Sequence, residues 1–224
     1  MSKEVAWRSS LLGSCCALGL LGLGLGPSYL YGGSTHLSIL SFFHYSEYLV
    51  TAISNPKTLK LKSFLLDNTY EYWLAALLGW MEYFGELWLF PGLKLNPIPW
   101  YLGLVLCGGG ELLRKAAMLN AGHNFTHQIQ MYHQPGHVLV TSGVYSLCRH
   151  PSYVGWFYWS IGTQMILCNP ICTVGYAVVS WMFFRNRVEG EEIVLINFFR
   201  EDYVRYQEKV PTGLPFIHGY RLAC

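Results

Sequence analysis

Charged residues are scarce in this sequence. Asp, Glu, Lys and Arg make up 12% of the 224 residues, whereas hydrophobic residues make up 52% and aromatic residues 16%. Ordinary soluble domains carry about 25% charged residues. The composition therefore excludes an ordinary water-soluble domain and favours a chain that lies in lipid. The formal net charge of +2 says little about partners, and nucleic acid is not among those we expect.

Paired cysteines are also missing. None of the seven cysteines belongs to a Cys-x-x-Cys pair, and most of them lie in apolar stretches. A disulfide framework is therefore not expected, and the thiols are predicted to be reduced, either buried in a membrane or facing the cytosol.

Two weak motifs lack the residues that would complete a site. His123 and His127 lie one helical turn apart, but neither a cysteine nor a pair of carboxylates stands beside them, so we predict no metal site. Gly108, Gly109 and Gly110 lack the strand and spacing of a dinucleotide-binding or phosphate-binding loop. These glycines are better explained by close packing between helices.

Long apolar segments dominate what is present, and no repeat or second domain interrupts them. Each is about the length of a membrane-spanning helix, although the first resembles a secretory signal and the fifth is short unless it begins near His150. The six segments are residues 11–26, 36–54, 70–90, 98–120, 156–168 and 171–184. The sequence thus predicts one all-α domain over residues 1–224, a polytopic transmembrane bundle of about six spans.

Basic residues fall almost entirely on alternate connections. They occupy residues 57–62, border the segment between the fourth and fifth spans, and recur after residue 184, whereas the opposite connections hold only Lys94. The positive-inside rule therefore places both chain ends and the region around His137 in the cytosol.

A polar stretch over residues 137–155 separates the fourth and fifth spans. Pro151 would begin a helix there, which places Arg149 and His150 at the helix N-terminus beside free backbone N–H groups. Such a helix start can receive the polar and carboxylate parts of a ligand.

A second charged motif continues the helical pattern of the sixth span. Helical spacing brings Arg187 and Glu191 onto one face, and Arg185 and Glu189 form a similar pair. Taken alone, such pairs are most often solvated surface ion pairs. Their position on the same side as Arg149 and His150 favours a shared half-buried cavity.

Four glutamates lie within or near the predicted spans. Acidic groups at that depth are candidates for function, including a transport pathway. The alternative is that they lie near helix ends or in pairs, as Glu111 does with Arg114 or Lys115 at helical spacing. The four are Glu47, Glu82, Glu86 and Glu111.

Two charged motifs and a terminal motif carry a resemblance to a known family. The motifs are RHPSYVGWFYWSIGTQ at residues 149–164, FFRNRVEGEE at residues 183–192 and VPTGLPF at residues 210–216. With SFFHYSEYLVTA and ELLRKAAM, they resemble the isoprenylcysteine carboxyl methyltransferases, membrane enzymes that methylate prenylated C-terminal cysteines. The resemblance covers roughly residues 40–219.

The resemblance implies S-adenosylmethionine as the methyl donor, in a cytosolic loop region and C-terminal helix that cover mainly residues 130–153 and 185–215. Arg187 is the residue expected to face the substrate and to act in catalysis. The implied cofactor contacts are Gln130, His137, Val138, Leu139, Val140, Tyr145, His150, Tyr153 and Glu191. The implied substrates are prenylated CaaX proteins of the small GTPase type, and the implied location is the endoplasmic reticulum membrane.

Other functional classes remain open from the sequence. Membrane sterol reductases, which use a nicotinamide cofactor, and phospholipid methyltransferases have a related arrangement. Composition alone also allows a membrane scaffold or a transporter, although a transporter would not need both charged motifs.

Overall fold

The structure, a computed structural model, describes residues 3–66, 69–133 and 135–221. The regular elements of these ranges are helices, which confirms the predicted all-α class. The α-helices are α1 (Lys3–Leu25), α2 (Tyr31–Ser54), α3 (Tyr70–Leu89), α4 (Pro97–Ala121), α5 (Pro151–Ile166), α6 (Pro170–Phe199) and α7 (Glu201–Lys209).

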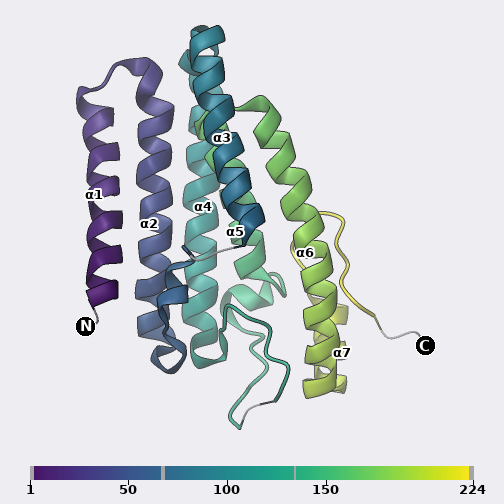
Figure 1. The fold of residues 1–224 in the computed structure, drawn as a ribbon. Helices are drawn as coiled ribbons and strands as arrows, with labels where there is room; N and C mark the ends of the chain where they lie inside the picture. The colour runs from purple at the N-terminus through teal and green to yellow at the C-terminus, as the bar shows by residue number, and fades with distance from the viewer. Residues whose placement is uncertain (1–2, 67–68, 134, 222–224) are drawn as a thin grey trace.

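Helices α1 to α6 run up and down as one bundle (Figure 1). The N-terminus, the long loop between α4 and α5, and α7 lie at one end, whereas the α1–α2, α3–α4 and α5–α6 turns lie at the other. The polar motifs of the sequence are thereby collected at one end of the bundle.

Proline begins three of these helices. Pro97, Pro151 and Pro170 each occupy the first turn, where the missing N–H costs no hydrogen bond. The helix predicted to start at Pro151 is therefore present, with His150 immediately before it.

Helix α6 is longer than the sixth predicted span. It continues without a break from the apolar segment to Phe199, so residues 193–199 extend the helix and do not yet turn back toward the bundle. The turn falls at Arg200, where φ is +51°, and α7 follows it.

Small residues bring α4 and α5 together. A Cβ atom on Gly110 or on Gly155 would overlap the backbone carbonyl of the other glycine. Among the described residues, no atom of another element lies within 4 Å of such a Cβ on Gly108 or Gly109. Close packing therefore explains only one of the three consecutive glycines.

Two acidic residues of α3, Glu82 and Glu86, have polar partners at the end of the bundle away from the polar motifs. Glu86 accepts a hydrogen bond from the buried Lys94 ammonium at 2.6 Å. Glu82 accepts the backbone N–H groups of Ile171 and Cys172, both at 2.7 Å, at the start of α6. These pairings favour the structural explanation over a transport pathway.

Candidate active site

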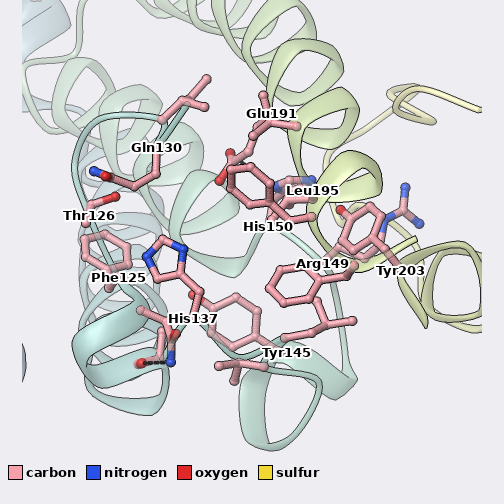
Figure 2. Close-up of a pocket in the computed structure, with 18 of the residues that line it drawn as sticks. Phe125, Thr126, Gln130, His137, Tyr145, Arg149, His150, Glu191, Leu195 and Tyr203 are labelled. Atoms are coloured by element: carbon pink, nitrogen blue, oxygen red, sulfur yellow. Dashed lines mark hydrogen bonds and ion pairs between the residues drawn. The ribbon is translucent and has the colours of Figure 1, made fainter. Parts of the chain in front are cut away.

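A pocket lies at the polar end of the bundle (Figure 2). It is lined by the α4–α5 loop, by the first turn of α5, by the last turns of α6 and by α7. The pocket is open to solvent, and its empty space with the open mouth included is about 990 Å³. All nine residues predicted to contact a cofactor line it: Gln130, His137, Val138, Leu139, Val140, Tyr145, His150, Tyr153 and Glu191.

The start of α5 forms one wall of this pocket. His150 and Tyr153 stack with their rings parallel to within 3° and their centroids 5.4 Å apart. The backbone N–H groups of Arg149 and His150 donate to Pro211 and Thr212, at 2.9 and 3.2 Å. The C-terminal segment thus fixes the entry into α5 from behind the pocket.

Tyr153 connects the two charged residues of α6. Its hydroxyl donates to Glu191 Oε2 at 2.5 Å and accepts from Arg187 Nε at 2.9 Å. Arg187 Nη2 also donates to the backbone carbonyl of His127 at 2.7 Å. Arg187 does not itself line the pocket, so it lies beside the pocket and is separated from it by Tyr153.

The adjacent Glu191 and Glu192 have different environments. The Glu191 side chain is 27% exposed and lines the pocket, whereas the Glu192 side chain is fully buried. Glu192 accepts hydrogen bonds from five groups: Arg149 Nε, His150 Nε2, Tyr203 Oη, Gln207 Nε2 and the Tyr220 backbone N–H. Of these two glutamates, Glu191 therefore lines the pocket, and Glu192 holds the C-terminal segment together.

The charge of Glu192 is stabilised by its partners. Burial by itself would raise the pKa of this carboxyl, but the hydrogen bonds and charges of His150 and Arg149 outweigh burial and lower the pKa below its usual value. Arg149 also donates to the backbone carbonyls of Gln207, Val210 and His218. Arg149 is therefore a structural residue of the loop.

The loop between α4 and α5 forms the opposite wall. Asn124 Oδ1 accepts the Val138 N–H at 2.9 Å, and the Tyr206 hydroxyl of α7 donates to the Tyr145 carbonyl at 2.5 Å. Burial, together with the nearby His133 and His123, lowers the pKa of His137.

Several lining residues were missed by the sequence analysis. They come from the loop before Gln130, from the last turns of α6 and from α7: Phe125, Thr126, Gln128, Ile129, Val194, Leu195, Phe198, Phe199, Tyr203 and Tyr206. Their signal is weak because apolar residues near a membrane are common. These residues come together because the loop contacts α6. One such contact joins the rings of His133 and Phe198, whose centroids are 5.3 Å apart.

Comparison with known proteins connects this geometry to one family. Residues 101–197 match the model of the "Isoprenylcysteine carboxyl methyltransferase (ICMT) family". The protein-S-isoprenylcysteine O-methyltransferase of Xenopus laevis is 54% identical over 98% of this chain and 76% of its own length. The chain belongs to the isoprenylcysteine carboxyl methyltransferase family. The human protein-S-isoprenylcysteine O-methyltransferase is 52% identical, over 98% of this chain and 77% of its own length.

A solved structure shows the same fold. It is the structure of the eukaryotic intramembrane Ras methyltransferase ICMT, with a TM-score of 0.96 and 46% identity, covering 97% of this chain and 78% of that one. Membership in this methyltransferase family does not favour the sterol reductase, phospholipid methyltransferase, scaffold and transporter alternatives. The predicted resemblance is confirmed.

Proposed function

We propose that this protein transfers a methyl group from S-adenosylmethionine to the free C-terminal carboxylate of an S-prenylated cysteine, forming a methyl ester. The observation that carries this proposal is the Tyr153 hydroxyl, which joins the pocket carboxylate Glu191 to Arg187 beside the pocket. Glu191, which can bind a cation, and Arg187, which can bind a carboxylate, thus lie next to each other at a single site.

The pocket fits the methyl donor chemically. Glu191 can accept charge-assisted hydrogen bonds from the donor's ammonium group. Val138, Leu139 and Val140 provide apolar surface, and His137, Tyr145 and the stacked rings of His150 and Tyr153 provide flat surfaces for an adenosine, with Gln130 as a further polar contact. We assign the cofactor-binding roles to these nine residues.

Arg187 is assigned to the substrate carboxylate. Its Nε and one Nη2 hydrogen are bound to Tyr153 and His127, and a guanidinium has five N–H donors. Three remaining donors can therefore hold a carboxylate while the side chain keeps its orientation. Fixing the acceptor in this way provides the near-attack geometry that lowers the barrier.

No general base is needed for this reaction. A terminal carboxyl group has a pKa of about 3.5 and is ionised at neutral pH. S-adenosylmethionine supplies a methyl group on a sulfonium: the S–CH3 bond breaks as the O–CH3 bond forms, and both charges are neutralised. A bound donor and substrate would displace water from the pocket, and a drier site favours a reaction that removes charge.

Cofactor binding tests this function directly. In isothermal titration of the purified full chain, S-adenosylhomocysteine is expected to bind, and Glu191→Gln is expected to weaken it about 10-fold or more because a charge-assisted hydrogen bond is lost. Glu189→Gln, whose carboxylate pairs with the exposed Arg185, is the matched control and should bind as the wild type does. Binding of reduced nicotinamide dinucleotide alone would instead favour the reductase alternative.

The membrane arrangement is part of the proposal. By length and composition, α1 is the one helix of the described residues that is long and apolar enough to cross a membrane. We propose that all six helices from α1 to α6 span the endoplasmic reticulum membrane with the pocket facing the cytosol. Prenylated proteins of the small GTPase type would then reach the site from the cytosolic leaflet.

Glycosylation at Asn124 tests that topology. Asn124-Phe-Thr126 is a formal acceptor sequon, and it lies in the α4–α5 loop on the side that carries most of the basic residues. We expect no glycosidase-sensitive mass shift when the chain is made in microsomes, with a secreted glycoprotein as the positive control. A glycosylated Asn124 would show that the loop faces the lumen.

A further inference from the structure

A buried ionic cluster lies behind the proposed substrate side of the site. The carboxylate of Glu47 in α2 has no exposed surface and pairs with Arg114 of α4, whose Nε and Nη2 donate to it at 2.6 and 2.9 Å. The Lys115 ammonium also contacts Glu47, and Arg114 reaches Ser152 in the first turn of α5 at 3.0 Å. Glu47 is therefore held rigidly by α4, which is itself joined to α5.

A further partner of the Glu47 carboxylate comes from the α4–α5 loop. His127 Nε2 lies 2.8 Å from Glu47 Oε2, although 80 residues separate the two in sequence. Apart from His127, the cluster contains two cations, Arg114 and Lys115, beside the buried Glu47 carboxylate. Glu111, 3.3 Å from Lys115, is a second acid. The His127 imidazole thus anchors the loop to the rigid part of the bundle.

The same residue of the loop contacts Arg187. The carbonyl of His127 accepts Arg187 Nη2 at 2.7 Å, while Tyr153 accepts Arg187 Nε at 2.9 Å. These two acceptors lie on different segments and together fix the plane of the guanidinium. Tyr153 is part of α5, so its position does not depend on the loop, whereas the position of the carbonyl does.

We propose that Glu47 is a positioning residue for Arg187, acting through His127. The carboxylate holds the imidazole, the imidazole holds the His127 backbone, and the backbone carbonyl sets the direction in which Arg187 presents its remaining donors to the substrate carboxylate. This inference rests on the proposed role of Arg187. Phe125, a loop residue that lines the pocket, has a separate anchor. Asn55 Nδ2 donates to the carbonyls of His123 and Phe125, both at 3.0 Å.

The test changes His127, because Glu47→Gln would leave two buried cations without their carboxylate and endanger folding. In the full chain, His127→Ala is expected to lower kcat/KM for N-acetyl-S-farnesylcysteine about tenfold, the usual effect of losing a hydrogen bond to a charged group. His127→Gln, whose side-chain amide replaces the Nε2–H donor, should restore most of the loss. Tyr132→Ala, at an 80% exposed position of the same loop, is the control and should match the wild type.

A double mutant separates positioning from a general loss of loop structure. When Arg187 is already lysine, His127→Ala should cost only about a further twofold, because two changes that act through one contact are not additive. The affinity for S-adenosylhomocysteine should stay within about twofold of wild type in His127→Ala. Additive losses, an unchanged kcat/KM in His127→Ala, or an equal loss of cofactor affinity would each overturn the inference. Inactive wild-type protein would instead count against the proposed function.

Discussion

Replacing Arg187 with lysine is expected to lower kcat/KM for N-acetyl-S-farnesylcysteine about 100-fold while S-adenosylhomocysteine still binds normally. The guanidinium uses Nε and Nη2 on Tyr153 and the His127 carbonyl and keeps other donors for a substrate. A lysine ammonium has three donors at a single point and cannot hold both acceptors and a planar carboxylate together. Steady-state kinetics on the substrate and titration of the cofactor measure the two effects separately.

The helix provides a matched control two residues away. Arg185 pairs with Glu189 at 3.6 Å, and its side chain is 57% exposed, so Arg185→Lys should keep wild-type kinetics. Equal kinetics in Arg187→Lys and Arg185→Lys would show that Arg187 does not hold the substrate carboxylate. A parallel loss of cofactor affinity in Arg187→Lys would place Arg187 on the donor instead of the acceptor.

Parts of the fold that depend on local chemistry were predictable from the sequence. Pro151 begins α5 because a proline is tolerated in the first turn and not beyond it, and the helical pattern of residues 183–192 continues α6 because no residue there breaks it. The reversal at Arg200 was not predictable. A non-glycine residue with a φ of +51° is uncommon, and nothing in residues 193–199 marks the end of the helix.

Contacts between distant segments limited what the sequence could show about the site. Glu191 and Glu192 are neighbours of the same type, and only their surroundings separate a pocket residue from a buried acceptor of five hydrogen bonds. Helical spacing correctly paired Glu111 with Lys115, at 3.3 Å. Spacing gave no means of pairing Glu47 with Arg114, 67 residues away, because that contact depends on how α2 packs against α4.

The prenyl chain is expected to decide whether a cysteine is a substrate. A cysteine carboxylate has the same reactive oxygen atoms with or without a prenyl group, so the methyl transfer itself cannot distinguish them. Each buried methylene contributes about 0.8 kcal/mol, and a chain of about 15 carbons adds on the order of 10 kcal/mol to partitioning from water into lipid. We therefore expect N-acetyl-S-farnesylcysteine to be methylated about 1,000-fold faster than N-acetylcysteine at equal bulk concentrations, even if only part of that energy is used.

Partitioning and recognition by the protein are separated by a series of S-alkyl chains of increasing length. Methylation rates, divided by the amount of each compound measured in the vesicles, should still rise toward farnesyl if the bundle itself contacts the chain. Tryptophans of α5 are natural contacts for such a chain, but Trp159 is buried and stacked on Phe43 with a centroid separation of 4.0 Å. Trp156 and other partly exposed apolar residues are therefore the candidates that we favour. Equal normalised rates for N-acetylcysteine and its farnesyl derivative would show that the membrane only concentrates the substrate. The protein would then recognise only the carboxylate held by Arg187, and not the prenyl chain.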